Sequence, residues 1–173
     1  MAERVVIFID GSNLYHCLKG DFGHTNLDFE KFARQLCAGR HLVRTYYYNA
    51  PVRAQDHPEM AKNQQRFFDK LREVPYLTLK LGHLEPRGNT VVEKGVDVAI
   101  AVDMLQLAYR DVYDTAILVS GDADFATAVE AVQGLGKHVE NAMGRTGQSR
   151  LLRQTCDRFI PLTKDLLQDC WLP

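Results

Sequence analysis

The stretch VVIFIDGSN (residues 5–13) decides the fold of this chain. Its five apolar residues run without interruption and end at Asp10, which Gly11 and two polar residues follow. A short apolar run closed by turn residues is typical of a strand buried on both faces of a parallel sheet. Gly11 would permit a tight turn, and Ser12 or Asn13 could cap the helix that follows. The stretch therefore predicts a buried strand, a turn and a helix.

Similar units recur along the chain. Further strand candidates are LVRTYYYNAP (42–51), YLTLKLGHL (76–84), AILVS (116–120), KHVENA (137–142) and RFIPL (158–162). Helices are expected over residues 28–37, 56–72, 96–109 and 123–135. Alternating strands and helices predict a mostly parallel sheet covered on both faces by right-handed crossovers. The expected fold class is therefore α/β, a three-layer sandwich of the PIN-like or Rossmann-like kind, with a small hairpin excursion near 84–93 around Gly88-Asn89.

The length and composition indicate one globular domain over residues 1–173. Apolar residues make up 46% of the chain and charged residues 25%, which is ordinary for such a domain. The apolar run at the N-terminus is too short for a signal peptide or a membrane span, so we expect a cytoplasmic protein without membrane contact. The cysteines are widely scattered and form no CxxC pair, so buried or free thiols are expected.

The net charge of −1 bears on the class of partner. A dedicated nucleic-acid-binding protein normally carries an excess of basic residues, so the charge counts against that class. It does not count against an enzyme that handles a polyanion through a metal ion and a few local cations. A homodimer is compatible with the sequence, although no residue demonstrates one.

Aspartates stand where strands are expected to end. Asp10 follows the first strand, and Asp122 and Asp124 follow the strand 116–120 within SGDADF. In open α/β sheets, sites form at the carboxyl ends of the strands. The alternative for Asp10 and for the SGDADF pair is capping of the following helix, and the sequence leaves this alternative open.

A third acid, Asp97, lies in KGVD at the start of the expected helix 96–109. The stretch VDVAIAVDMLQLA is apolar almost all the way round, so we expect this helix to be heavily buried. A buried carboxylate is costly unless something receives it. The start of a crossover helix lies at the same sheet edge as Asp10 and Asp122. Asp103 lies on another side of the helix, where a structural hydrogen bond is the expected role.

Carboxylates that converge at one edge repel one another unless a cation joins them. Oxygen ligands favour hard ions, so Mg²⁺ or Mn²⁺ bound by Asp10, Asp97 and Asp122 is the expected cofactor. Such an ion can activate water and neutralise charge that develops on a phosphoryl group. These residues therefore predict hydrolysis of a phosphodiester.

The runs FIDGSNL (8–14), KGVDVAIAVDML (94–105) and ILVSGDADF (117–125) resemble the three signature segments of NYN-domain proteins, in the LabA-like branch of the PIN-like nuclease superfamily. The closing run SRLLRQTCDRFIPL (149–162) is similar to the family's usual ending. This resemblance implies a PIN-like fold with an acidic Mg²⁺ or Mn²⁺ site on Asp10, Asp97 and Asp122, with Asp124 a fourth acid. It also implies that Asn13 holds a water or orients Asp10, and that the substrate is RNA.

Candidate substrate contacts surround these acids. GRTGQSR (144–150) follows another expected strand end, and its Gly, Ser, Thr and Arg residues suit a loop that faces phosphate. Lys94 precedes Asp97 and could offset the local negative charge. For each cation, a solvated surface position is the alternative. The candidate substrate-binding residues are Ser12, Lys94, Arg145, Ser149 and Arg150.

Two functions remain open. The first is a metal-dependent ribonuclease, an endoribonuclease, in which Asp10, Asp97, Asp122, Asp124 and Asn13 form the catalytic site. The second is a non-catalytic regulatory or protein-interaction module that keeps the fold, and the LabA-like branch includes proteins with regulatory roles. The intact acids favour the first, and the near-neutral charge favours the second.

Overall fold

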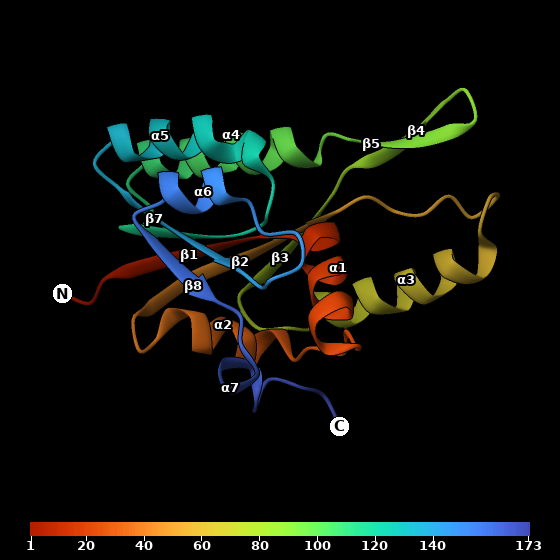
Figure 1. Ribbon diagram of the computed structural model, residues 1–173, viewed down its shortest axis with the longest axis horizontal. Helices are drawn as coiled ribbons and strands as arrows, with labels where there is room; N and C mark the ends of the chain where they lie inside the picture. Colours follow the sequence, from red (N-terminus) through yellow and green to blue (C-terminus); the bar gives the residue numbers. More distant parts are fainter.

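Six parallel strands form the centre of the protein, in the order β3-β2-β1-β6-β7-β8. The computed structural model describes residues 1–173 (Figure 1). The strands are β1 (Arg4–Asp10), β2 (His41–Asn49), β3 (Leu77–Leu81), β6 (Thr115–Val119), β7 (His138–Met143) and β8 (Arg158–Pro161). Every neighbouring pair in this sheet is parallel, as the alternation of strands and helices predicted.

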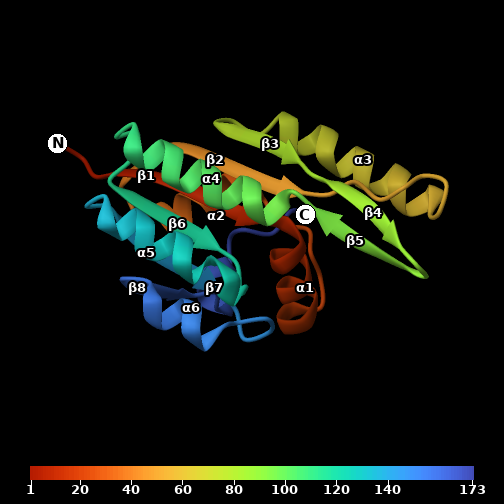
Figure 2. The ribbon, with the colours of Figure 1, turned by 90° about the horizontal axis from the view of Figure 1, so that it is seen from above.

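Helices cover both faces of the sheet, which confirms the three-layer arrangement (Figures 1 and 2). One face carries α1 (Gly11–Phe22), α2 (Phe29–Cys37), α3 (Pro58–Arg72) and α7 (Lys164–Leu167). The other face carries α4 (Val96–Tyr109), the short 3-10 helix η1 (Ala123–Phe125), α5 (Ala126–Gly134) and α6 (Arg150–Thr155). Each face has its own hydrophobic core, of 22 and 17 buried residues respectively.

Strand β1 contributes side chains to both hydrophobic cores. Val5, Ile7 and Ile9 point into the core beneath α1 and α2, whereas Val6 and Phe8 point into the core beneath α4 and α5. All five side chains are fully buried. Successive side chains of a strand alternate between faces, so an unbroken apolar run is what a strand buried on both sides requires.

The order of the strands changes direction beside β1. The chain proceeds from β1 to β2 and β3 on one side, and later builds β6, β7 and β8 on the other side. The connections on the two sides therefore diverge between the carboxyl ends of β1 and β6. Such a switch point is the usual place for a ligand in an open α/β sheet.

The expected hairpin is present and stands apart from the central sheet. Strands β4 (His83–Arg87) and β5 (Thr90–Lys94) pair antiparallel around Gly88-Asn89 and project from the body of the molecule (Figures 1 and 2). The prediction of one strand over 76–84 was wrong, because β3 ends at Leu81 and the chain leaves the sheet at Gly82. A Cβ atom at Gly82 would lie 2.5 Å from the carbonyl oxygen of Lys94, so the hairpin's two ends meet closely there.

The prediction that α4 is heavily buried was also wrong. One stripe of the helix, containing Val96, Ile100 and Met104, packs on the sheet. The opposite side faces solvent, and the side chains of Val98 and Val102 are 68% and 52% exposed. The helix forms the outer layer of a three-layer fold, so only its inner stripe can be covered. No helix of the chain combines the length and the apolar character needed to cross a membrane.

The four cysteines are free and buried, as expected. Burial raises the pKa of Cys17 and of Cys37 to about 11, and that of Cys156 to about 12. Their thiols are therefore protonated at neutral pH and poorly nucleophilic.

One ion pair lies largely inside the fold, at the edge of the sheet opposite the strands' carboxyl ends. The guanidinium of Arg40 donates two hydrogen bonds, of 2.7 and 2.9 Å, to the carboxylate of Glu140 on β7. Arg40 also donates to backbone carbonyl oxygens of Leu36 and Cys37 at the end of α2. The pair thereby joins α2 to the strand beneath it.

We predict that Arg40→Ala lowers the free energy of unfolding by about 3 kcal/mol, because Glu140 is left buried without a partner. Urea denaturation followed by circular dichroism measures the change. Arg34→Ala is the matched control, because it removes an exposed pair with Glu30 and should cost less than about 0.5 kcal/mol. Equal losses in the two variants would contradict a structural role for the buried pair.

Candidate acidic site at the carboxyl edge of the sheet

Asp10 ends β1 and caps α1. Its Oδ1 accepts a hydrogen bond of 3.3 Å from the backbone N–H of Asn13, and its Oδ2 accepts one of 2.9 Å from the Asn13 side chain. The hydroxyl of Ser120 donates to the same Oδ2 at 3.2 Å. The helix cap is therefore Asp10, which is the alternative that the sequence left open, and neither Ser12 nor Asn13 takes that position. Asp10 is only 2% exposed, so these donors hold a buried carboxyl in a fixed orientation.

Asn13 and Ser120 connect the turn after β1 to the turn after β6. The Asn13 side-chain oxygen accepts the backbone N–H of Gly121 at 3.0 Å. The Ser120 hydroxyl accepts the backbone N–H of Asp122 at 3.1 Å. The two strand ends that carry acids are thus joined by side-chain hydrogen bonds.

Asn141 on β7 supports the same turn from the other side. Its side-chain amide donates to the carbonyl oxygens of Leu118 and Ser120, at 3.0 and 2.9 Å. Asn141 is fully buried, and its side-chain oxygen has no partner. A polar residue in the centre of a sheet is costly unless it hydrogen-bonds, so its two bonds indicate that the turn after β6 is held rigidly.

Asp122 and Asp124 form the start of η1. Asp122 caps it by accepting the backbone N–H of Asp124 at 2.9 Å, so the capping alternative holds for Asp122 as well. A carboxylate has room for further ligands beyond one capping bond. Asp122 is half-buried and Asp124 is exposed, and both remain accessible from solvent.

Asp97 lies in the first turn of α4, two residues after Gly95, which adopts a left-handed conformation with φ 86°. Partial burial raises the pKa of Asp97, and the neighbouring carboxyls of Asp122 and Asp124 raise it further. The start of α4 therefore faces the turn after β6, as the direction of a crossover helix predicted.

Glu93 joins this group from the hairpin. Burial raises the pKa of the Glu93 carboxyl, and the charge of Asp97 raises it further. The negative charge of Glu93 also raises the pKa of Asp10, although less than burial does. No pattern in the sequence singles out Glu93, because its position depends on where the hairpin returns to the sheet.

The electrostatic state of the site is set by burial and crowding. Burial raises the pKa of Asp10 to about 7, and the charges of Asp97 and Glu93 act in the same direction. Hydrogen bonds from Asn13 and Ser120 oppose the rise. None of the ion pairs of the chain includes an acid of this group. The edge therefore carries negative charge that no side chain neutralises.

The donor chemistry of the group suits a hard divalent cation, because every available ligand atom is an oxygen. The spacing is open, however, since no three His, Cys, Asp or Glu side chains come close enough together to hold a metal ion by themselves. Mg²⁺ commonly binds through one or two carboxylates and completes its shell with water and substrate phosphate. Residues at this edge fit that mode of binding rather than a closed protein cage.

The predicted substrate contacts fall into two places. Ser12 in the first turn of α1 and Lys94 at the end of β5 are chain neighbours of the acids. Arg145, Ser149 and Arg150 lie beyond β7, in the loop that leads to α6 and at the start of that helix. The Ser149 hydroxyl accepts the backbone N–H of Leu152 at 3.1 Å, so it is the N-cap of α6.

The loop after β7 is nevertheless a neighbour of the acidic turn. A Cβ atom at Gly121 would lie 1.6 Å from the carbonyl oxygen of Gly147, so the two backbones touch. Arg145 and Arg150 are exposed on this loop and helix. Arg153 is engaged elsewhere, since it lies 4.2 Å from the centroid of the Phe159 ring and donates to Gln148.

Asp103 takes no part in the acidic group. Its Oδ2 accepts hydrogen bonds of 2.7 Å from the Tyr48 hydroxyl and from Lys80. The structural role expected for Asp103 is confirmed. Tyr47 and Tyr48 are core residues, one on each face of β2, as the alternation of the strand required.

Residues that the sequence reasoning missed include Ser120, Asn141 and Glu93. Ser120 directly follows the apolar strand β6, whereas Asn141 lies in β7, which also contains His138 and Glu140. A polar side chain at the end of a run that predicts complete burial is a signal that could have identified Ser120, but the mixed sequence of β7 offers no such signal for Asn141. Glu93 lies on an exposed hairpin strand and offers no such signal.

Comparison with known proteins places residues 4–163 within the model of the NYN domain family. The chain is 30% identical over 167 residues to the Low amplitude and bright protein LabA of Synechococcus elongatus, covering 92% of this chain and 84% of that protein. It is 34% identical over 85 residues to the uncharacterized protein y4oD of Sinorhizobium fredii, covering 47% and 38% of the two chains. A crystal structure of a protein of unknown function from Vibrio parahaemolyticus has a similar fold, with a TM-score of 0.74 and 26% identity over 99% of this chain and 97% of that chain.

We predict that Asp10 titrates near pH 7 in the folded protein when divalent ions are removed with EDTA. A carboxyl whose pKa is raised by folding binds its proton more tightly in the folded state, so stability falls as pH rises from about 4 to about 7. Between pH 5 and pH 8 this one group lowers the free energy of unfolding by about 2.5 kcal/mol. Carbon-13 NMR of the side-chain carboxyl measures the titration directly.

Asp97→Asn provides the control for that titration. Removal of a neighbouring negative charge lowers the pKa of Asp10 towards its ordinary value, because one cause of the shift is lost. A wild-type Asp10 that titrates near pH 4 would contradict the electrostatic description of the edge.

Proposed function

The chain belongs to the NYN domain family, and we propose that it is a metal-dependent ribonuclease acting at the carboxyl edge of β1 and β6. Membership in this family supports a nuclease-like fold and site. The proposal for this chain adds the reaction, hydrolysis of RNA phosphodiester bonds, and the ion, Mg²⁺ or Mn²⁺.

The observation that carries the proposal is the convergence of carboxyls from four separate segments. Asp10 ends β1, Glu93 lies on β5, Asp97 begins α4 and Asp122 follows β6. Burial raises the pKa values of Asp10, Glu93 and Asp97, and the negative charges of neighbouring acids raise them further. Such an arrangement costs stability in the free protein, and a divalent cation would relieve that cost.

Asp10, Asp97 and Asp122 are the residues that would hold the ion, with Asp124 as a fourth acid at the exposed rim. When bound, the cation supplies activation of water and neutralisation of the charge that develops on the phosphoryl group. The other residues position these ligands. Asn13 and Ser120 hold both oxygens of Asp10, and the same two side chains fix the turn that carries Asp122.

Hydroxyl and cationic side chains near the acids would bind the phosphates of the substrate. Ser12 lies next to the Asp10 cap and has no hydrogen bond within the protein that would occupy its hydroxyl. Lys94 lies between Glu93 and the start of α4 and supplies the local positive charge. Arg145 and Arg150 lie farther along the edge, where they suit neighbouring phosphates of a longer strand.

A second function, a non-catalytic regulatory or interaction module, is favoured by one observation. The acids do not form a closed three-ligand group, and a module that had lost catalysis would have no need of one. The exposed valines on α4 would then belong to a contact surface. The first function explains why further acids lie around the buried Asp10, whereas the second leaves this group of acids without a role.

We expect purified protein to cleave labelled single-stranded RNA with Mn²⁺ or Mg²⁺ and not with EDTA. Asp97→Asn, nearly isosteric but uncharged, lowers the cleavage rate at least about 100-fold, because a ligand of the ion is lost. The measurement is the rate of product formation on a denaturing gel, with single-stranded DNA as the comparison substrate.

Asp69→Asn is the matched control, because Asp69 is exposed on α3 and contacts only Gln65 and Arg72. Thermal melting with and without Mn²⁺ provides a second readout, in which the ion raises the melting temperature of the wild type but not of Asp97→Asn. Mn²⁺-dependent stabilisation without cleavage of any RNA would favour the interaction module.

A further inference from the structure

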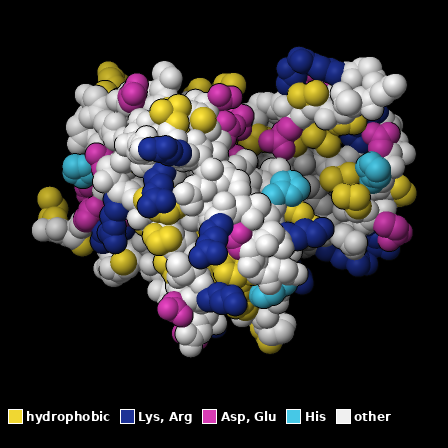
Figure 3. Space-filling view, viewed as in Figure 1, with side chains coloured by type: hydrophobic (Ala, Val, Ile, Leu, Met, Phe, Trp, Pro, Cys, Tyr) yellow, Lys and Arg dark blue, Asp and Glu magenta, His cyan; other side chains and the backbone are white.

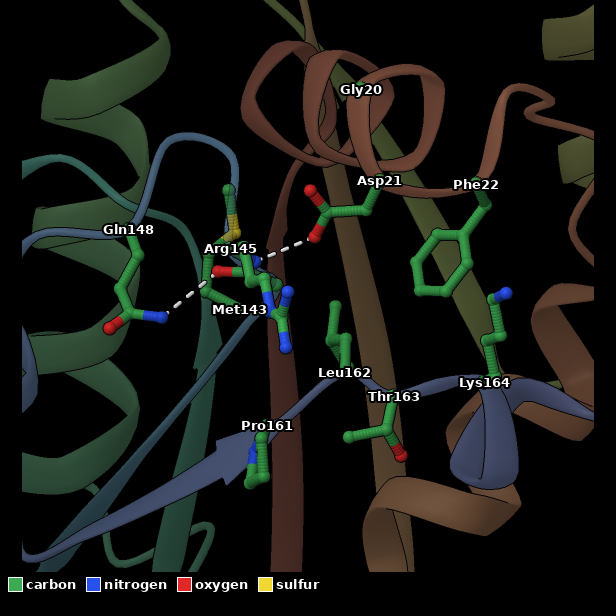
Figure 4. Close-up of a pocket in the computed structure, with 11 residues that line it drawn as sticks. Gly20, Asp21, Phe22, Met143, Arg145, Gln148, Pro161, Leu162, Thr163 and Lys164 are labelled. Carbon is green, nitrogen blue, oxygen red and sulfur yellow. Dashed lines mark hydrogen bonds between the residues drawn. The ribbon is translucent and has the colours of Figure 1, made fainter.

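A cavity lies at the same edge of the sheet as the acidic site, beyond the carboxyl ends of β7 and β8. It is an open cavity of about 670 Å³ between the end of α1 and the ends of these two strands. Figure 4 shows Asp21 and Phe22 at the top, Arg145 to the left and below Asp21, and Thr163 and Lys164 below Phe22. Cavities of 300–1,000 Å³ commonly take ligands of nucleotide size.

The wall that carries Arg145 is built to a fixed shape. The Asp21 carboxylate accepts the backbone N–H of Arg145 at 2.6 Å and that of Thr146 at 3.0 Å. A Cβ atom at Gly20 would lie 2.6 Å from the Thr146 hydroxyl, and one at Gly144 would lie 2.2 Å from the Asp21 carboxylate. The loop after β7 therefore packs directly on the end of α1, which only glycine allows at both positions.

The charge available to a ligand in this cavity is positive. Arg145 and Lys164 are exposed, and neither belongs to an ion pair. The one acid of the wall, Asp21, is occupied by the backbone and hydroxyl donors of the loop, and these donors lower its pKa. On the face seen in Figure 3, Lys and Arg side chains extend from α6 down to α7.

The cavity also presents an aromatic ring. Phe22 lies beside Lys164 at the cavity wall (Figure 4). Its ring centroid is 5.7 Å from that of Trp171, so it is supported from behind. A fixed ring beside two free cations is the combination that binds one base and its phosphates in single-stranded nucleic acids.

The cavity is connected to the acidic edge through the loop that separates them. Gly147 touches Gly121, the residue before Asp122, and Arg145 lies two residues from Gly147 on the cavity side. A strand whose phosphate lies at the acids can therefore pass over this loop and place a neighbouring nucleotide in the cavity.

We propose that this cavity binds a nucleotide of the RNA strand next to the cleaved phosphodiester, with its phosphates on Arg145 and Lys164 and its base against Phe22. The inference rests on the proposed ribonuclease function and adds a second binding point for the same strand. The Thr163 hydroxyl accepts the backbone N–H of Leu166 at 3.2 Å and keeps its proton for donation to a phosphate oxygen. Arg145 and Lys164 are positioning residues, since they lie away from the acids.

The test measures binding of a fluorescent 10-nucleotide RNA in EDTA, where no cleavage occurs. Arg145→Ala and Lys164→Ala each weaken binding about fivefold to tenfold at low salt. Each also reduces the slope of log affinity against log salt concentration by about 0.7, the value for one lost contact with a single-stranded phosphate. Lys70→Ala, an exposed cation near the end of α3, is the matched control and leaves both quantities unchanged.

Phe22 is tested by two substitutions, because Phe22→Ala also removes packing against Trp171. Phe22→Ala lowers the affinity for the RNA about tenfold, whereas Phe22→Tyr keeps the aromatic ring and has the affinity of the wild type. Loss in both variants, or in neither, overturns the role of the ring.

The outcomes separate this proposal from the proposed function. Cleavage of RNA together with unchanged salt slopes in Arg145→Ala and Lys164→Ala overturns the cavity proposal and leaves the ribonuclease intact. Binding that follows the predicted slopes without cleavage under any metal supports the cavity and overturns the ribonuclease. Uridine monophosphate binding as tightly as the 10-nucleotide RNA overturns the assignment to a strand and indicates a free nucleotide instead.

Discussion

The parallel pairing of β1 with β2 and β6 is the constraint on which the rest of the structure depends. Parallel strands run in the same direction, so all their carboxyl ends lie at one edge of the sheet. Each connection must return the chain to the opposite edge before the next strand begins, because a tight turn cannot join parallel neighbours. The carboxyl edge collects residues from distant parts of the sequence, including Asp10, Asp97 and Asp122, and it also contains the cavity after β7 and β8.

The carboxyls of Asp10 and Asp122 have two roles at this edge. Asp10 and Asp122 cap the helices that follow them, which stabilises the fold. Burial of Asp10, together with the charges of Asp97 and Glu93, raises its pKa to about 7 and costs stability. Capping and a metal site were alternatives at the level of the sequence. In the structure they are compatible, because a carboxylate that accepts a backbone N–H still has lone pairs for another ligand.

Glycines allow the edge to be compact. Gly121 touches Gly147, and Gly20 and Gly144 let the loop after β7 pack on α1. Through these contacts the acidic turn is joined to the wall of the cavity after β7 and β8 without any intervening side chain. The acidic turn and the cavity are therefore separated only by the loop after β7, which is the arrangement that the proposal of one extended substrate uses.

The sequence by itself determined the sheet and most of its helices. The apolar runs 5–9 and 116–120 required burial on both faces, and α4 begins and ends where predicted, at Val96 and Tyr109. It also identified Asp10, Asp97 and Asp122 as residues of one edge, because strand ends and helix starts converge in any parallel sheet. Failures occurred where packing overrides local pattern, as in the division of residues 76–84 between β3 and the hairpin.

Only the tertiary structure decided which side chains surround those acids. Ser120 hydrogen-bonds to Asp10 and the charge of Glu93 acts on its pKa, although both residues are far from Asp10 in the sequence. The spacing along the chain does not indicate either interaction. The exposure of Val98 and Val102 likewise depends on whether another layer covers α4. The hydrophobic pattern of a helix or strand indicates which of its residues face a neighbouring element. The distances between elements are set only when the helices pack on both faces of the sheet.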